Sequence, residues 1–176
     1  PKALIPIAGK PMLSYIIEEL QEAEVEEFIS IVGYLGDKII DFVNSTYPQL
    51  KSHFVHQIQR DGLAQAVSLC RQYISPSDEI VIVLGDSIID VDFKEIIQLN
   101  KSVLGVKKVD DPSKFGVAEV NPDGTIKSLV EKPLIPKSNL ALVGLYIIKE
   151  TAVLMQCIND LIENNKKTNS EFQLTD

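Results

Sequence analysis

The sequence predicts an α/β fold, with a Rossmann-like, mostly parallel sheet flanked by helices and an antiparallel β addition. In the first half of the 176 residues, amphipathic helical segments alternate with short apolar runs, which is typical of a parallel sheet with crossover helices. In the second half, four strand-like runs follow one another, which indicates antiparallel pairing. One domain spanning residues 1–176 is expected from this length.

The first half is predicted to contain three helices and three strands. Apolar residues at helical spacing predict helices over about 12–23, 37–47 and from Gly62 onward. The stripe of the third helix is Leu63, Val67, Cys70 and Ile74. Apolar runs predict strands at 28–32, 53–57 and 80–84. The last of these is uninterrupted and rich in β-branched residues, so we expect it to be covered on both faces.

The second half reads mainly as strands, expected at 104–109, 115–120, 126–130 and 140–148. Asn121-Pro-Asp-Gly124 lies between two of them and predicts a hairpin turn. A final helix is expected over about 151–164, with Val153, Leu154, Cys157, Ile158, Leu161 and Ile162 as its buried side.

Composition excludes several classes of protein. The net charge of −8 argues against a duplex nucleic-acid binder, which needs a basic face, but leaves a nucleotide substrate open. Cys70 and Cys157 lack zinc or disulfide spacing, and both are expected to be buried as small apolar residues. No signal peptide or membrane-length apolar run is apparent, so a cytoplasmic location without membrane contact is expected.

The first twelve residues, Pro-Lys-Ala-Leu-Ile-Pro-Ile-Ala-Gly-Lys-Pro-Met, predict a rigid loop. Pro6 and Pro11 would each break a helix, and the run is too interrupted for a central strand. The loop would hold Lys2 and Lys10 in fixed places and lead directly into the first helix. Loops held on a scaffold in this way often carry function.

Asp86 follows the predicted strand at 80–84, after Gly85. In open α/β sheets the carboxyl edge of the strands is where ligands bind. A carboxylate there suits Mg²⁺, which takes oxygen ligands from one or two carboxylates and from substrate phosphates. The alternative is that Asp86 only caps the next turn, and the residues alone leave both interpretations open.

Two further segments hold candidate polar contacts. Gln57 offers both a donor and an acceptor to a nucleobase edge, and Gly62 begins a helix whose first amides suit a polar ligand. Asp61 is expected to cap that helix. Lys132 is a point charge suited to phosphate, and Glu131 could accept hydrogen bonds from sugar hydroxyls. A solvated surface pair is the alternative for these last two residues.

Six motifs follow one another in order. They are the opening Pro-Lys segment, Asp-Gly-Leu-Ala-Gln-Ala at 61–66, Leu-Gly-Asp at 84–86, Phe-Gly-Val-Ala-Glu at 115–119, Glu-Lys-Pro at 131–133 and Glu-Phe-Gln-Leu-Thr-Asp at 171–176. None is specific alone. Their series closely resembles the sugar-phosphate nucleotidylyltransferases over residues 1–176, and most of all the glucose-1-phosphate thymidylyltransferase branch.

The resemblance implies the nucleotide-diphospho-sugar transferase fold and an enzyme that joins a sugar 1-phosphate to a nucleoside triphosphate and releases pyrophosphate. It favours dTTP and glucose 1-phosphate as substrates and Mg²⁺ as cofactor. On the nucleotide side, it implies that Lys2 contacts the triphosphate and that Gln57 and Gly62 read the base. Asp86 and Asp176 would hold the metal ion.

On the sugar side, the resemblance implies that Lys132 contacts the 1-phosphate. Gly116, Glu131 and Val143 would line the sugar pocket. Lys2, Asp86 and Lys132 are therefore the expected catalytic residues. Family members are commonly homo-oligomers, which leaves the oligomeric state of this chain open.

The chain also departs from the family pattern. The family's N-terminal strand and glycine-rich, Thr-Arg-containing loop are missing before Pro1, and its continuation is missing after Asp176. We expect that strand to lie inside the sheet, so that these residues alone would leave an apolar face exposed and could be inactive.

Three alternatives remain open at this point. The first keeps the reaction but uses UTP, CTP, GTP or ATP with another sugar phosphate, because one thymine methyl is worth only about 1–3 kcal/mol. The second is a non-catalytic regulatory subunit or sugar-nucleotide sensor. The third, an unrelated dinucleotide-binding domain, is disfavoured because the G-x-G-x-x-G turn is absent.

Overall fold

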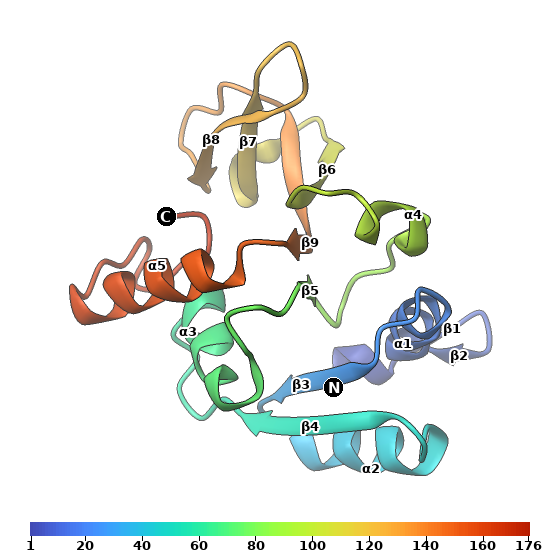
Figure 1. Cartoon of the computed structure of the whole chain (residues 1–176). Coiled ribbons are helices and arrows are strands. Elements are labelled where there is room, and N and C mark those ends of the chain that lie inside the picture. Colours follow the sequence, from blue (N-terminus) through green and yellow to red (C-terminus); the bar gives the residue numbers. More distant parts are fainter.

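The computed structural model describes all 176 residues, and helices and strands alternate through its first half (Figure 1). In chain order these are α1 (Met12–Glu22), β3 (Glu27–Val32), α2 (Gly36–Thr46), β4 (Lys51–His56), α3 (Leu63–Ser68) and β5 (Ile80–Val83). Each predicted strand of this half is present within two residues of its expected ends.

The opening segment is a 3-10 turn followed by a small hairpin. A 3-10 turn, η1 (Lys2–Leu4), precedes β1 (Pro6–Ile7) and β2 (Lys10–Pro11), which pair antiparallel. Ala8 and Gly9 form the two-residue connection with φ of 47° and 95°, and two positive φ angles suit the twist of a tight hairpin. The hairpin leads directly into α1, as the sequence indicates.

The second half forms an antiparallel sheet from β6 (Val103–Lys108), β7 (Gly116–Val120), β8 (Ile126–Glu131) and β9 (Leu140–Ile148), which also takes in β5. Strand β9 is central, because it pairs antiparallel with β5, β6 and β7. The predicted turn joins β7 to β8: the Asn121 amide donates to the Thr125 carbonyl at 2.8 Å, and Gly124 has φ of 82°.

The α/β class and the antiparallel addition are confirmed, but parallel pairing is limited to one ladder. Strand β3 pairs in parallel with β4, from Glu27 opposite Lys51 to Val32 opposite His56. Strand β5 pairs only with β9, antiparallel, and no ladder joins β3 to β5. The antiparallel part is therefore larger than the sequence pattern indicates. The expectation of a further strand inside the sheet stays a prediction.

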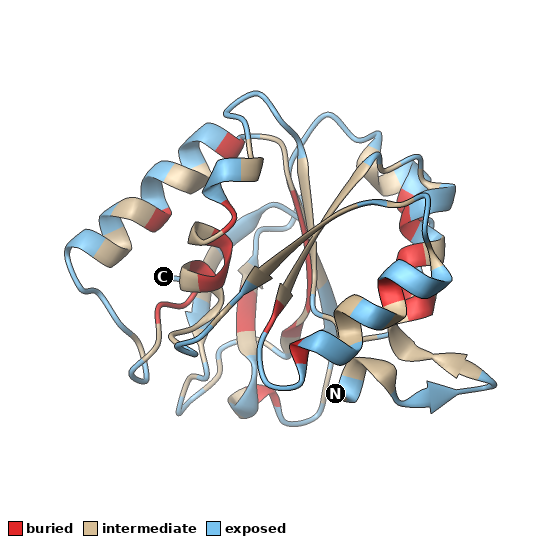
Figure 2. Ribbon diagram, turned by 90° about the horizontal axis from the view of Figure 1, so that it is seen from below, coloured by how far each residue is buried: buried red, intermediate tan, exposed pale blue.

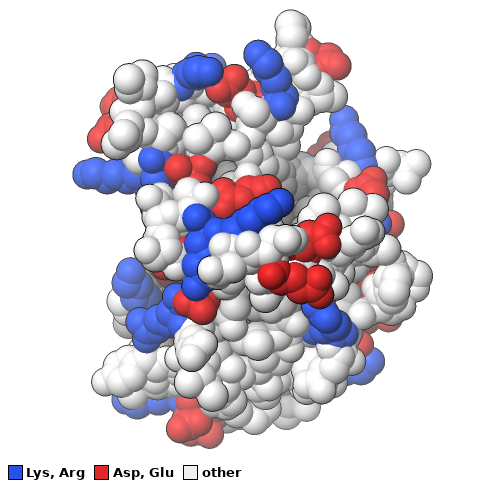
Figure 3. Space-filling view, turned by 90° about the vertical axis from the view of Figure 1, so that its left-hand side faces the viewer, with Lys and Arg blue, Asp and Glu red and all other residues white.

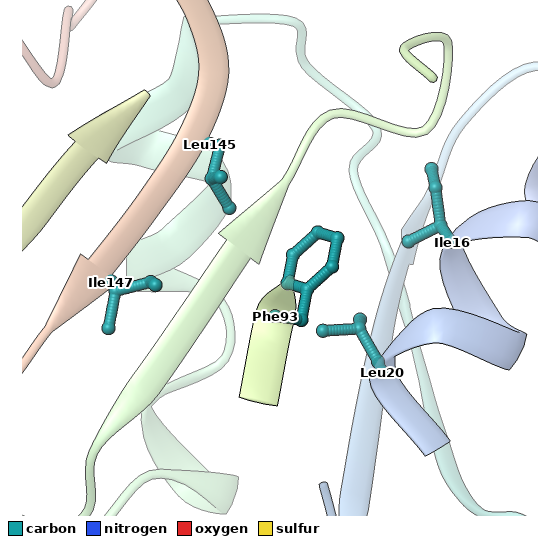
Figure 4. Packing of buried hydrophobic residues seen from close by; sticks show 5 residues of the cluster. All are labelled: Ile16, Leu20, Phe93, Leu145 and Ile147. Carbon is teal, nitrogen blue, oxygen red and sulfur yellow. The ribbon is translucent and has the colours of Figure 1, made fainter. Parts of the chain in front are cut away.

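The apolar core lies between β9 and the helices. Figure 2 shows buried positions in the central strands and on the inward sides of the helices. In the largest cluster, Phe93 lies between Leu145 and Ile147 of β9 and Ile16 and Leu20 of α1 (Figure 4). A second cluster joins α3 to α5 (Thr151–Glu163) through residues that include Ala64 and Ile158.

Two local expectations are corrected, and one short helix is present that the sequence pattern did not predict. Helix α3 ends at Ser68, whose hydroxyl bonds back to the Gln65 carbonyl at 2.6 Å, and a 3-10 turn, η2 (Arg71–Tyr73), follows. Cys157 is exposed, not buried, because α5 contacts the core along the stripe that includes Ile158. A short helix, α4 (Phe93–Ile97), was not predicted; Asp92 caps it by accepting from the Glu95 amide at 2.9 Å.

No helix of the chain combines the length and the apolar character needed to cross a membrane.

Candidate active site

Lys2 and Asp86 meet at the end of β5. The Lys2 Nζ lies 3.9 Å from the Asp86 Oδ2, and their side chains are 80% and 52% exposed. A Cβ at Gly85 would lie 3.8 Å from the Ala3 Cβ, so the η1 turn contacts the loop that holds Asp86. The structure thus brings the candidate triphosphate lysine and the candidate metal carboxylate together on an accessible surface.

Gln57 follows β4 and is held by two acceptors. Its Nε2 donates to the Gln65 Oε1 at 2.8 Å and to the Gly62 carbonyl at 3.3 Å. A backbone carbonyl can only accept, so the contact with Gly62 fixes which end of the Gln57 amide points inward. The Gln57 Oε1 is left free to accept a hydrogen bond from a ligand.

Gly62 must be glycine. Its φ is 98°, and a Cβ there would lie 2.4 Å from the Phe172 carbonyl oxygen, which no side chain can tolerate. The Phe172 carbonyl accepts from the Ala64 amide at 3.0 Å, and the Phe172 amide donates to the Asp61 carbonyl at 2.7 Å. The segment around Phe172 therefore fixes the loop around Gly62.

Asp61 does not cap α3, contrary to expectation. The residue at the N-cap position is Gly62, and no side chain caps the helix. The Asp61 carboxylate lies 3.6 Å from the Lys167 Nζ, which also lies 4.5 Å from the centre of the Phe172 ring. The Asp61 carboxylate is therefore paired with Lys167 and not with the first amides of α3.

Gly116, Glu131 and Lys132 come together where β7 and β8 pair. Gly116 lies opposite Glu131 in the ladder, and a Cβ at Gly116 would lie 3.0 Å from the Glu131 Oε2. The Lys132 Nζ lies 3.5 Å from the Glu131 Oε1, whose side chain is only 11% exposed. The Lys132 amide donates to the Phe115 carbonyl at 3.0 Å and its φ is 43°. A positive φ is uncommon for lysine.

The side chain of Val143 lies apart from this group. It packs against the cluster that contains Leu145 and Ile147, whereas Leu142, in a different cluster, faces Gly116. The Val143 carbonyl accepts from the Ser87 hydroxyl at 3.4 Å, one residue beyond Asp86. Val143 is therefore placed near the loop after β5 through its backbone.

Asp176 is exposed, and its neighbour Thr175 donates to the Glu131 Oε2 at 3.1 Å. Figure 1 shows the C-terminal end of the chain close to the end of β8. No group of three or more His, Cys, Asp or Glu side chains converges on one point. Two exposed carboxylates, Asp86 and Asp176, fit the oxygen chemistry of Mg²⁺ when substrate phosphates supply further ligands.

Lys10, which had no expected role, contacts α1 through its side chain. Its ammonium hydrogen-bonds to Glu18 and lies 4.1 Å from the centre of the Tyr15 ring. The hydrogen bond to Glu18 raises the pKa of Lys10 above its ordinary value. Lys10 thus secures the opening hairpin.

Two polar residues of the site were missed in the sequence. Gln65 orients Gln57, and Thr175 contacts Glu131. Both lie inside motifs quoted above, but the contacts join segments eight and 44 residues apart. Figure 3 shows basic and acidic side chains interspersed on the side of the molecule where α5 lies, with no single basic patch.

Comparison with known proteins gives consistent matches over the whole chain. The Nucleotidyl transferase family matches residues 1–174. The bifunctional protein GlmU of Methanocaldococcus jannaschii is 37% identical over 177 residues, which cover 100% of this chain and 40% of GlmU. The low-salt glycan biosynthesis nucleotidyltransferase Agl11 of Haloferax volcanii is 29% identical, with coverage of 100% and 50%. The chain thus spans half or less of these relatives' length.

Solved structures give the same result. A Bacillus anthracis protein named as a glucose-1-phosphate thymidylyltransferase, in complex with sucrose, has a TM-score of 0.78 and 25% identity, over 96% of this chain and 68% of that one. An apo UDP-glucose pyrophosphorylase also has a TM-score of 0.78 and 25% identity, over 99% and 76%. Both resemble this chain through nearly its entire length.

Proposed function

Since the chain belongs to the Nucleotidyl transferase family, we propose that it transfers a nucleotidyl group from a nucleoside triphosphate to a sugar 1-phosphate. The products are a nucleotide sugar and pyrophosphate. The observation that carries this proposal is the placement of Lys2 beside Asp86. A phosphate-binding cation and a metal-binding carboxylate at one strand end are what phosphoryl chemistry requires.

In the proposed reaction an oxygen of the sugar 1-phosphate attacks the α-phosphorus in line. A new phosphorus–oxygen bond forms, the bond between the α-phosphorus and the bridging oxygen breaks, and pyrophosphate leaves with the electron pair. Lys2 orients the triphosphate and Lys132 orients the sugar phosphate. Positioning and charge stabilisation supply the rate, because the protein forms no covalent bond.

Asp86 and Asp176 are the residues that would hold Mg²⁺, which supplies positive charge beside the α-phosphate when bound. Both side chains are accessible, and Asp86 has Lys2 as its ion-pair partner. An exposed ion pair contributes little free energy, so Lys2 can exchange this carboxylate for a phosphate at small cost.

The orientation of Gln57 supports a base that carries a ring N–H. Its Nε2 is used by Gln65 and Gly62, so its Oε1 is the atom available to the base. Thymine, uracil and guanine offer a ring N–H to that oxygen, whereas cytosine and adenine present a ring acceptor and can donate only through their exocyclic amino groups. Because Asp-Gly-Leu-Ala-Gln-Ala at 61–66 also resembles the thymidylyl branch, we favour dTTP, with UTP as the close alternative.

The Glu131 carboxylate supports a sugar with free hydroxyl groups, and glucose 1-phosphate is favoured. Gly116 lies opposite Glu131, and a Cβ there would come within 2.8 Å of the Leu142 Cδ1 and 3.0 Å of the Glu131 Oε2. A side chain at this position would therefore displace the carboxylate that is proposed to accept a sugar hydroxyl. Lys132, adjacent in sequence, would then contact the 1-phosphate of the same substrate.

The test is a pyrophosphate-release assay on the full-length protein with Mg²⁺. Each of dTTP, UTP, CTP, GTP and ATP is paired with glucose 1-phosphate, N-acetylglucosamine 1-phosphate or mannose 1-phosphate. We expect release with dTTP or UTP and glucose 1-phosphate. Tight binding of a nucleotide sugar without release from any pair would instead indicate a non-catalytic sensor.

A further inference from the structure

The opening segment places no residue in the apolar core. None of residues 1–12 is buried, and the Ile5 and Ile7 side chains on either side of Pro6 are 51% and 37% exposed. A segment with few buried apolar contacts opens at a low cost in free energy. The position of Lys2, which lies in this segment, therefore depends on polar contacts between the segment and the rest of the chain.

Polar contacts hold the hairpin on α1. The Tyr15 hydroxyl donates to the Ile7 carbonyl at 2.8 Å. The Lys10 ammonium hydrogen-bonds to Glu18 and lies 4.1 Å from the centre of the Tyr15 ring. Tyr15 and Glu18 are three residues apart and therefore share one face of the helix. That face holds both strands of the hairpin, β1 through Ile7 and β2 through Lys10.

Glu18 is itself held from a second helix. Tyr47, at the C-terminal end of α2, donates its hydroxyl to the Glu18 Oε1 at 3.1 Å, whereas Lys10 contacts the Oε2. The Tyr47 amide donates to the carbonyl of the buried Val43 at 2.8 Å. The terminal torsion of a glutamate side chain is broad, so two donors on its two oxygens are needed to fix the plane of the carboxylate. Lys10 thus meets an acceptor that is already fixed in place.

The hairpin is joined to Lys2 through the backbone. The Ile5 amide donates to the Lys2 carbonyl at 2.9 Å, and the Met12 amide donates to the Ile5 carbonyl at 3.0 Å. The side chain of Lys2 has an exposed ionic contact with Asp86 at 3.9 Å, which restrains it weakly. The hairpin therefore determines where Lys2 lies more than this ion pair does.

We propose that Glu18 is a positioning residue that holds the opening hairpin through Lys10 and thereby places Lys2 for the triphosphate, an inference that rests on the proposed function. Glu18 acts through Lys10 and not on the substrates. Without this contact the hairpin would move and Lys2 would move with it. The candidate sugar residues on β7 and β8 make no contact with the hairpin, so only the nucleotide side of the site should respond.

The experiment is a double-mutant cycle on both KM values in the full-length protein. Glu18→Met and Lys10→Met each remove the contact, and each should raise the KM for the triphosphate about fivefold while the KM for the sugar 1-phosphate stays within about twofold. The double variant should also show about a fivefold rise, because both substitutions remove the same contact. Lys10→Arg keeps the charge and should stay close to wild type. Lys94→Met breaks an ion pair with Glu24, just beyond the end of α1, and is the matched control.

An unchanged KM for the triphosphate in either single variant would overturn the proposal. Equal rises in both KM values would also overturn it, because they indicate a general structural defect. Additive effects, about 25-fold in the double variant, would show that the two residues do not act through one contact and would overturn it as well.

If the wild-type protein releases no pyrophosphate, the proposed reaction is wrong, and Glu18 is judged by calorimetry of dTTP and UTP binding with Mg²⁺. Fivefold weaker binding of the nucleotide in Glu18→Met and in Lys10→Met, but not in Lys94→Met, then supports the positioning role. Equal binding by wild type and variants, or no binding by the wild type, overturns it.

Discussion

The ammonium of Lys2 lies 3.9 Å from the carboxylate of Asp86, and both side chains are largely exposed to solvent. The contact joins the opening turn to the end of a strand that comes more than 80 residues later in the sequence. An exposed pair of this kind adds little to stability. Its two partners are therefore available to a triphosphate and a metal ion, and their substitution should affect activity far more than folding.

Asp86→Asn should lower turnover by at least about 100-fold, because removing one charge that stabilises a transition state typically costs that much. The midpoint of urea unfolding should stay unchanged, since the side chain is half exposed. Pyrophosphate release and urea unfolding measure the two effects. Asp41→Asn, at an exposed position of α2, is the control, and near-normal turnover in Asp86→Asn would remove Asp86 from the metal site.

Lys2→Met should raise the KM for the triphosphate about tenfold, because a charge-assisted contact is lost. The KM for the sugar 1-phosphate should change little, since Lys132 is the expected partner of that phosphate. Steady-state kinetics with each substrate varied in turn separate the two. Lys38→Met alters an exposed lysine of α2 and should leave both KM values unchanged; a rise confined to the sugar phosphate would contradict the role of Lys2.

Gln65→Met should weaken discrimination between bases, because Gln57 would lose the acceptor that holds its Nε2 inward. We expect the ratio of kcat/KM for dTTP over CTP to fall about tenfold, the effect of one polar contact. Competition assays with both nucleotides measure the ratio. Gln65→Glu keeps an acceptor at this position and should preserve the ratio, and an unchanged ratio in Gln65→Met would contradict the assigned orientation of Gln57.

Lys132→Gly and Lys132→Ala should differ in stability although both remove the same charge. The φ of Lys132 is 43°, and left-handed backbone costs a non-glycine residue about 1–2 kcal/mol. We therefore expect the glycine variant to be more stable than the alanine variant by about 1 kcal/mol in urea unfolding. Turnover should fall strongly in both. Equal stability would show that this backbone conformation carries no strain.

The two cysteines should react differently with a thiol reagent. Burial raises the pKa of the Cys70 thiol to about 11, whereas Cys157 is exposed. The native protein should therefore expose one reactive thiol at pH 8, and the protein in denaturant should expose two. Reaction of both thiols at the same rate in the native state would contradict the burial of Cys70, which lies between α3 and η2.

The same pKa determines a pH dependence of stability. In the unfolded chain the thiol ionises near pH 8.5, whereas in the folded chain it stays neutral until about pH 11. The folded state binds more protons between these values, so this group lowers stability as the pH rises from about 8.5 to 11. Cys70→Ala should flatten that decline in urea unfolding measured across the range.

Much of this fold was predictable because local patterns determine it. The apolar stripe of α1, the run at β5 and the Asn121–Gly124 turn each specify an element without help from distant residues. Helix α4 was not predicted because five residues are too few to show a helical repeat of apolar residues. The only local sign of it in the sequence is Asp92, which caps its N-terminus. The exposure of Cys157 depends on where α5 meets the core, which its own sequence does not determine.

The residues of the candidate site likewise fall into those that the sequence motifs indicate and those that only the structure reveals. Motifs indicated Lys2, Asp86, Gln57, Gly62, Gly116, Glu131 and Lys132, and the structure brings members of this set into contact in separate groups. Gln65 and Thr175 could not be assigned, because their roles depend on which side chain lies next to theirs in space. Both faces of β9 are covered by apolar clusters, so the position of the Val143 side chain depends on which cluster lies on its face of the strand.

The segment from Phe172 to Thr175 touches both halves of the candidate site. Its first residue bonds to the backbone on either side of Gly62, and its last bonds to the carboxylate of Glu131. A nucleotide that steadies the Gly62 loop would also steady the Glu131 carboxylate, so if this carboxylate binds the sugar as proposed, binding of each substrate should tighten binding of the other. Thermodynamic linkage requires that this cooperativity have the same magnitude in both directions.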